Sequence, residues 1–324
     1  MALHLYLDQT DVIGIASSIT VSGSVDQCCR TLRAEIAASY YDSRIPVAET
    51  TLGKLVRFYD GAELLFYGSL FTVQLSTNGN TKSIVAFDMG YFLKNNAATY
   101  VFRGQTPDEI ARRACRDYWV PVGKLAATGK GVTRKFQNVS LDKIIDTAYT
   151  LGGQNGVKYL TRFQGAALNI IVKGEPKSAT VIEGVINLQN LTYSLSSEGM
   201  VNSAKVYDKD GNLLMTRTNP ENPSSVYGLR TKILSQREGE DVDKQIRDLF
   251  EDNDLEHKIT VSVFASNDMI TGNAVYLIEP FTKQKGLFWI DEDSHTWKNG
   301  MHTASLTLNF KNIMREGEAG TEET

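Results

Sequence analysis

The amino-acid sequence predicts a mainly β protein with an α+β insert, arranged as two β-barrel, tube-like modules plus a small α+β domain. Three observations predict this fold class. Short alternating strands separated by turn residues occur at both ends of the chain, capped helices are concentrated in the middle, and one β-unit is repeated. The expected parts are a first β-barrel module over 1–96, the α+β domain over 97–175, a second β-barrel module with one packed helix over 176–314, and a disordered tail over 315–324.

The repeated β-unit is the most informative of the three observations. Its shared positions are Gly53 and Gly272, Val56 and Val275, Gly68 and Gly286, and the alternating apolar strands near 84–87 and 306–310. The two glycines of each copy stand 68 − 53 = 15 and 286 − 272 = 14 residues apart. A chain that carries one β-module twice supplies six modules from three subunits. Chance similarity between two hairpins stays open as the alternative.

In the first module, alternation predicts strands over 19–22, 31–37, 55–59 and 64–75. Asp60-Gly61 separates the last two, and this pair predicts a hairpin because both positions tolerate a positive φ. Strands at this spacing favour an antiparallel sandwich or barrel.

The middle of the chain changes from strands to helices. Thr106-Pro107-Asp108-Glu109 is a capping box, with proline at the first helical position. Ser140 predicts the start of a second helix and Gly152 its end, and residues 157–173 return to strand. These elements predict a small α+β domain.

The last part of the chain is again β-rich, with one helical interruption. In 241–252, the apolar residues Val242, Ile246, Leu249 and Phe250 form one stripe, so we expect this helix to pack on the barrel. An alternating strand follows over 259–265. The pattern leaves open whether the strands near 176–235 complete the first or the second barrel.

Composition excludes several classes of function. The chain has 324 residues, 42% of them hydrophobic and 22% charged, and its net charge of −4 disfavours direct binding to duplex nucleic acid. Three cysteines without metal spacing predict buried free thiols and synthesis in a reducing cytoplasm. No signal peptide and no apolar stretch of membrane-spanning length is recognisable, so we expect a soluble protein without membrane insertion.

One polar cluster with the residue types of a chemical site is present, formed by Asp291, Glu292, Asp293, His295 and His302. Carboxylates and imidazoles bind divalent metals, but this cluster flanks a hairpin tip at 297–300. A solvated turn with one packed histidine is therefore the favoured interpretation, and a metal site the alternative.

Two further acidic groups imitate known sites. Asp208, Asp210 and Asn212 imitate the start of a calcium loop, but Asn219 stands where the closing glutamate belongs, which favours a plain hairpin. Asp108 and Glu109 are explained by helix capping, and no hydrolase motif is present. The sequence thus predicts no catalytic, cofactor-binding or metal-binding residues and no enzyme activity.

Short motifs in a consistent order run from the start of the chain to about residue 312. They are Val21-x-Gly23, Arg30-Thr31-Leu32, Tyr59-Asp60-Gly61, Leu65-Phe66-Tyr67-Gly68, Ala86-Phe87-Asp88, Tyr91-Phe92-Leu93, the segment 102–110, Gly286-Leu287-Phe288-Trp289-Ile290, Asp293, His295-x-Trp297 and Gly300-x-His302. In this order and spacing they resemble the XkdQ/YqbQ-type family of phage baseplate hub proteins. The acidic tail departs from that family.

This resemblance implies a structural hub of a contractile phage tail or a phage tail-like particle, such as an R-type bacteriocin or a defective prophage. Such hubs form homotrimers whose two β-barrel modules per chain make a pseudo-sixfold ring between the tail tube and the spike. The implied partners are the tube, the spike and surrounding baseplate proteins, with DNA only as cargo through the lumen. The implied location is the bacterial cytoplasm during assembly and then the tail baseplate of the particle. No cofactor is implied.

Two alternatives from other classes remain. The segment 106–123 is loosely similar to a LysM module, which would make the chain a cell-wall-binding adaptor. A tail-associated peptidoglycan hydrolase would use Glu109 or Glu292, and substitution of either by alanine would abolish its activity.

Overall fold

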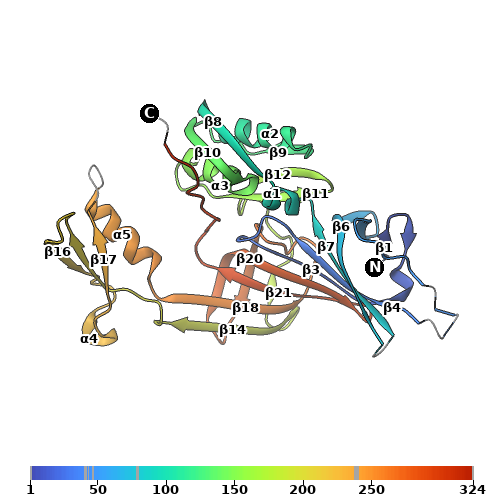
Figure 1. The fold of residues 1–324 in the computed structure, drawn as a ribbon. Helices are drawn as coiled ribbons and strands as arrows, with labels where there is room; N and C mark the ends of the chain where they lie inside the picture. The colour runs from blue at the N-terminus through green and yellow to red at the C-terminus, as the bar shows by residue number, and fades with distance from the viewer. Residues whose placement is uncertain are drawn as a thin grey trace. The chain divides into compact units, whose positions relative to one another are not determined.

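The computed structural model describes residues 2–39, 42, 44–45, 47–77, 80–236 and 241–322 of the chain. Strands dominate and helices are few, which confirms the predicted mainly β class (Figure 1). The chain divides into two compact units, the first made of 1–191 with 260–324 and the second of 192–259. The domain boundaries predicted at 96, 175 and 314 stay a prediction.

A thirteen-stranded sheet forms the main part of the structure. Its path is β14-β18-β21-β20-β3-β4-β7-β6-β5-β1-β2, and β19 adds to β20 and carries β13. The strands are β1 (Leu3–Leu7), β2 (Thr10–Asp11), β3 (Ala16–Ser24), β4 (Thr31–Ala37), β5 (Leu55–Asp60), β6 (Glu63–Ser76), β7 (Thr81–Asp88), β13 (Ile182–Glu183), β14 (Leu188–Ser196), β18 (Glu256–Phe264), β19 (Ala274–Glu279), β20 (Gln284–Lys298) and β21 (Met301–Asn309), and a 3-10 turn, η1 (Ile13–Ile15), lies between β2 and β3. The described strands do not close into two separate barrels, because β3 from the first half pairs directly with β20 from the second.

The strand order repeats along this path. The first strand module is β3-β4-β7-β6-β5 and the second strand module is β14-β18-β21-β20-β19. If the five strands of each module are numbered along the chain, both modules have the spatial order first, second, fifth, fourth, third. The small strands before the modules do not correspond in direction, since β1 pairs antiparallel with β5 and β13 pairs parallel with β19. The open question over 176–235 is thereby answered for β13 and β14, which belong with the second module.

Hydrogen bonds fix which residues correspond in the two modules. Gly53 N–H donates to the carbonyl oxygen of Leu70 over 2.8 Å, and Gly272 N–H donates to that of Ile290 over 2.9 Å. A register shift follows at once in both modules, after Leu70 in the β6–β7 pair and after Ile290 in the β20–β21 pair. These shared details support duplication more firmly than the sequence pattern does.

The geometry also corrects part of the sequence alignment. Gly53 and Gly272 have φ values of +84° and +90°, a region that favours glycine, so their correspondence has a conformational cause. The second glycines do not correspond. Val56 pairs with Gly68, whereas Val275 pairs with Phe288 and not with Gly286.

The α+β insert follows the first module. It consists of α1 (Gly90–Asn95), β8 (Ala97–Gln105), α2 (Pro107–Asp117), β9 (Val122–Leu125), β10 (Val132–Ser140), α3 (Leu141–Gly152), β11 (Tyr159–Gln164) and β12 (Ala167–Val172). The strands form a β8–β10 pair and a three-stranded sheet in the order β11-β12-β9. The helices α2 and α3 begin where the capping residues predict and α3 ends at Gly152 as predicted. Ile110, Ala114 and Ile144 are fully buried in the core that the two helices share.

The capping box of α2 yields a first test. The Glu109 carboxylate accepts a hydrogen bond from the Thr106 N–H over 3.0 Å, so Glu109→Ala is expected to lower the free energy of unfolding by about 0.5–1 kcal/mol. Glu109→Gln keeps the acceptor and should leave stability nearly unchanged. Urea denaturation of both variants checks this, and equal losses for the two would show that the carboxylate is needed for something other than capping.

The predicted disordered tail is corrected for residues 315–322, which lie against the insert. The Arg315 guanidinium forms ion pairs with Asp142, over 3.2 Å, and with Asp146, both on α3. Arg134 Nε donates to the Ala319 carbonyl oxygen over 2.8 Å, and Thr321 bridges to Lys135. The sequence could not reveal this placement, because the tail binds carboxylates and backbone groups that are distant along the chain.

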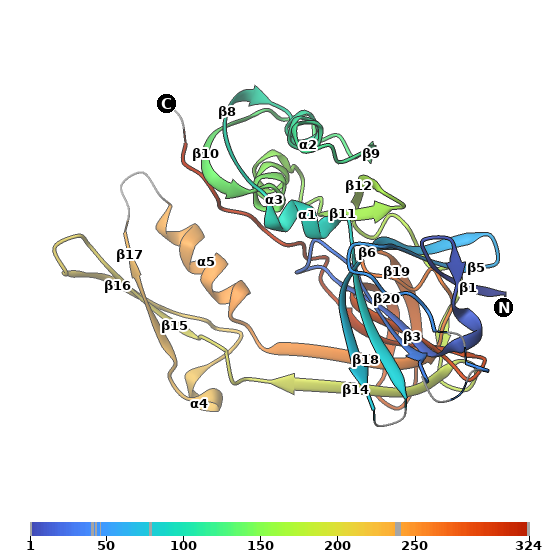
Figure 2. The same cartoon turned by 45° about the vertical axis from the view of Figure 1, so that its right-hand side comes forward.

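The second unit is a small sheet covered by one helix. It contains β15 (Ser203–Tyr207), β16 (Leu213–Thr218), α4 (Ser224–Tyr227), β17 (Thr231–Ser235) and α5 (Val242–Asp252), with strand order β16-β15-β17. Ile246 and Leu249 of α5 share a buried cluster with Ala204 and Val206 of β15, and α5 lies alongside this small sheet (Figure 2). The prediction that this helix packs on the barrel is therefore wrong, because its apolar stripe covers the unit's own sheet.

Candidate functional site

The two strand modules meet at a seam formed by β3 and β20. The register runs from Glu292 opposite Ser24 to Lys298 opposite Ser18. β20 has an edge available for β3 because β19 pairs with only its first part, ending at Trp289 opposite Ala274. A long strand thus serves two neighbours in turn, and this joins the modules into one sheet (Figure 1).

A buried ion pair lies at this seam. Arg30 Nη1 donates to Asp293 Oδ1 over 2.8 Å and Nη2 to Oδ2 over 2.5 Å. Asp293 Oδ1 also accepts from the backbone N–H and the hydroxyl of Thr271, each over 2.7 Å. Burial raises the pKa of Asp293, but the charge and hydrogen bonds of Arg30 outweigh it and hold that pKa below its usual range. A side chain at Gly23, opposite Asp293, would collide with the Arg30 guanidinium, which explains the glycine there.

Both histidines of the predicted cluster are buried beside the ion pair. His295 Nε2–H donates to the Met269 carbonyl oxygen over 2.9 Å, which leaves His295 Nδ1 as the acceptor for His302 Nε2–H at 2.8 Å. The ring of Trp297 stacks on His302 with centroids 4.3 Å apart. Burial, together with the nearby His295, lowers the pKa of His302 to about 4, so the pair is neutral near pH 7. The favoured interpretation of a solvated turn with one packed histidine is therefore wrong, since both side chains lie on inward positions of adjacent strands.

The carboxylates of the cluster have separate partners. Asp291 forms a buried ion pair with Lys173 and accepts from Asn309 Nδ2 over 2.7 Å. Glu292 is exposed and accepts from the Thr307 hydroxyl over 2.9 Å. Within the described part of the chain, no group of three or more His, Cys, Asp or Glu residues could hold a metal ion.

The other acidic candidates also have structural roles. Asp208 accepts hydrogen bonds from the backbone N–H groups of Asp210 and Asn212, which forms the turn between β15 and β16. Glu109 caps α2. The residues that sequence reasoning missed are Thr271, Arg162 and Lys173, because isolated polar residues carry no spacing signal that would place them at the seam.

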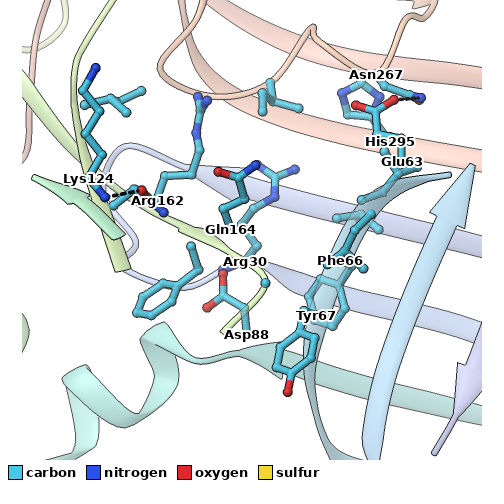
Figure 3. A pocket seen from close by; sticks show the side chains of 18 of the residues that line it. Arg30, Glu63, Phe66, Tyr67, Asp88, Lys124, Arg162, Gln164, Asn267 and His295 are labelled. Carbon is cyan, nitrogen blue, oxygen red and sulfur yellow. Dashed lines mark hydrogen bonds between the residues drawn. The ribbon is translucent and has the colours of Figure 1, made fainter. Parts of the chain in front are cut away.

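A cavity of about 410 Å³ adjoins the seam, between the main sheet and the insert (Figure 3). Its lining includes Arg30, Asp88, His295, Lys124 and Arg162. Burial, with a contribution from the nearby Arg30, lowers the pKa of Arg162 to about 10. Burial raises the pKa of Asp88 to about 7 even though the backbone N–H groups of Arg30 and Gly90 donate to it.

Polar side chains beside the cavity connect the insert to the main sheet. Arg162 Nη2 of β11 donates to the Asn273 side-chain oxygen over 2.9 Å and to the Thr271 carbonyl oxygen over 2.5 Å. The described residues that line the cavity include no serine or cysteine. Its polar groups position two parts of one unit.

The pKa of Asp88 leads to a prediction on pH dependence. Its folded pKa, about 7, lies above the reference value of 3.8, so ionisation of Asp88 opposes folding and stability falls as the pH rises between these values. We expect the wild type to lose on the order of 2 kcal/mol more than Asp88→Asn between pH 5 and pH 8. Urea denaturation of both proteins across this range measures the difference. The two buried histidines change stability with pH in the opposite direction, but they do so equally in both proteins, so their contribution cancels. Parallel curves for the two proteins would contradict the shift.

No helix in the described residues is both long and apolar enough to cross a membrane.

A family model described as YQBQ-like matches residues 19–309. The protein XkdQ of the phage-like element PBSX from Bacillus subtilis (strain 168) is 25% identical over 315 residues, which cover 94% of this chain and 95% of XkdQ. The 43 kDa tail protein of prophage MuSo2 from Shewanella oneidensis superposes with a TM-score of 0.72 at 13% identity, covering 95% of this chain and 98% of that one.

A more distant structural relative is the E. coli c3393 protein, with a TM-score of 0.58 at 10% identity, covering 99% of this chain and 80% of that one. It is described as a component of the type VI secretion system with structural similarity to the T4 bacteriophage tail proteins gp27 and gp5. At these identities the likeness shows the fold, and that fold is the one that phage tail proteins have.

Proposed function

We propose that this chain, which belongs to the YQBQ-like family, is a structural hub of a phage tail or phage tail-like baseplate. Three copies would close a ring of six strand modules that joins the tail tube to the spike. The observation that carries this proposal is the repeated strand order of the two modules. Three chains with two modules each match a sixfold tube on one side and a threefold spike on the other.

The relatives support the setting of this proposal. XkdQ belongs to a phage-like element, and the c3393 protein is likened to tail proteins of T4. On this basis we assign the chain to a contractile tail or a related particle, assembled in the host cytoplasm. The insert and the second unit would face surrounding baseplate proteins outside the ring, and DNA would pass through the lumen as cargo.

The proposed hub has no catalytic role. The carboxylates and histidines at the seam are committed to ion pairs and hydrogen bonds with each other, with Arg30 and with Lys173. They hold two modules and an insert in one arrangement, which is what a ring component requires. The hydrolase alternative needs Glu109 or Glu292 near a bound glycan, and neither lines the cavity.

The experiment is the native mass of the purified chain over a range of concentrations, with and without the candidate spike protein. A species of three times 35.9 kDa whose images show six lobes supports the hub. A trimer that forms only with the spike keeps the function and corrects the order of assembly. A monomer under every condition, combined with retention on peptidoglycan, would overturn the proposal in favour of a wall-binding adaptor.

A further inference from the structure

We infer that β14 of one copy of this chain pairs antiparallel with the open edge of β6 in a second copy, in the register that β3 and β20 use within one chain. This inference rests on the proposed function, since it names the contact through which the ring closes. It specifies which strands, which edges and which residues lie opposite one another.

The β3–β20 seam is the internal template. Within the repeat, β6 corresponds to β20 and β14 to β3. β20 takes β3 along the edge that β19 leaves open, beyond Ile290. β6 has the same open edge beyond Leu70, because β5 ends its pairing at Leu55 opposite Ser69 and the described strands next to β6 are β5 and β7 alone. β14 stands at one end of the sheet path, as an edge strand.

The correspondence can be carried to single residues. Leu70 and Ile290 are equivalent, so Thr72–Ser76 of β6 match 292–296 of β20. On β4 and β18, Ala38 N–H donates to Asn80 O over 2.7 Å as Ala265 N–H donates to His302 O over 3.1 Å. The strands that precede β4 and β18 in their modules, β3 and β14, are each nine residues long. Aligned end to end, they match Val21 with Tyr193 and Gly23 with Leu195.

The template then predicts the contacts between copies. The pair His295 and Val21 within the chain corresponds to Leu75 opposite Tyr193 between copies. The pair Asp293 and Gly23 corresponds to Val73 opposite Leu195. The inward positions of the internal seam carry a buried ion pair, whereas the corresponding positions between copies are mainly apolar.

Exposure on the two edges agrees with this pairing. Leu75 is 60% exposed and Leu195 is 55% exposed, although their counterparts in the template, His295 and Gly23, are both buried. Leucines that lie open on two edge strands favour association, since an unpaired edge with apolar side chains is a template for another strand. A second copy presents the complementary edge, and a closed rotational arrangement leaves neither edge open.

Disulfide cross-linking tests the register. Val25 N–H donates to Asp291 O, so pairs of the template alternate and Ser294–Ser22 is a non-hydrogen-bonded pair. Its counterpart between copies is Gln74 opposite Ser194, whose Cα atoms should lie about 4.5 Å apart, within the range of disulfides. The variant Gln74→Cys/Ser194→Cys is oxidised under mild conditions in a Cys29→Ser background. Its matched control is Gln74→Cys/Thr192→Cys, in which the cysteines are diagonal and about 7–8 Å apart.

We expect covalent trimers at a yield at least tenfold above that of the control. A trimer by native mass that cross-links no better in the test pair than in the control would overturn the register and leave the hub intact. No trimer in the reduced protein, even with the spike, would overturn both. As a second measurement, Leu75→Lys should weaken association at least tenfold, whereas Leu229→Lys, at a position 66% exposed in the second unit, should not. Equal association of the two lysine variants would overturn the role of the β6 edge.

Discussion

Replacing Arg30 by methionine is expected to lower the free energy of unfolding by about 3–5 kcal/mol, because it leaves the buried Asp293 carboxylate without its counter-charge. The Asp293 side chain has no exposed surface, and among the described residues the hydrogen bonds that remain to it are the two from Thr271. The charge therefore cannot be transferred to solvent unless the β3–β20 seam opens. Urea denaturation at pH 7 measures the loss.

Two variants separate this effect from lost packing. Arg30→Met/Asp293→Asn removes the stranded charge and should recover much of the loss, since an uncharged pair needs no compensation. Arg44→Met breaks an exposed ion pair with Asp42 and should leave the unfolding midpoint unchanged. A double variant as unstable as Arg30→Met would contradict the electrostatic explanation and assign the loss to packing of the arginine side chain.

The sequence predicts those parts of the fold that depend on neighbours along the chain. Alternation located the strands, and the capping residues located α2, because both signals arise within about four residues. The glycines before β5 and β19 revealed the repeat because a positive φ strongly restricts the residue type. Gly68 and Gly286 were aligned wrongly because they are glycines for different reasons: a Cβ at Gly68 would collide with the backbone of Phe87, whereas Gly286 has a φ of +152°.

The parts that could not be predicted depend on residues far apart in the sequence. Arg30 and Asp293 are separated by 263 positions, and Lys173 and Asp291 by 118. From sequence alone, an acidic residue on an inward strand position is predicted to be at the surface, because its partner is not known. For this reason the sequence predicts a solvated turn for the cluster from Asp291 to His302. The tail at 315–322 is a similar case, because its partners on α3 give no local signal.

Replacing Lys173 by methionine is the second large prediction. Its ammonium group is fully buried, pairs with Asp291 and donates to the Ile313 carbonyl oxygen over 2.7 Å. Burial lowers the pKa of Lys173 and raises that of Asp291, and in both residues this outweighs their mutual attraction. Without Lys173, the donor that the described residues still provide to the carboxyl group of Asp291 is the Asn309 amide, so we expect a loss of about 3–5 kcal/mol at pH 7.

The pH dependence of this variant distinguishes a stranded charge from a cavity. Because burial raises the pKa of Asp291, ionisation of this carboxyl group opposes folding, and stability falls as the pH rises. The loss in Lys173→Met, where the counter-charge is missing, should therefore be smaller at pH 5 than at pH 8. Lys158→Met, which breaks the more exposed pair with Glu316, should cost less than about 1 kcal/mol at both pH values. A loss in Lys173→Met that is the same at pH 5 and pH 8 would show that the lysine stabilises the junction between β12 and β20 by its methylene chain and not by its charge.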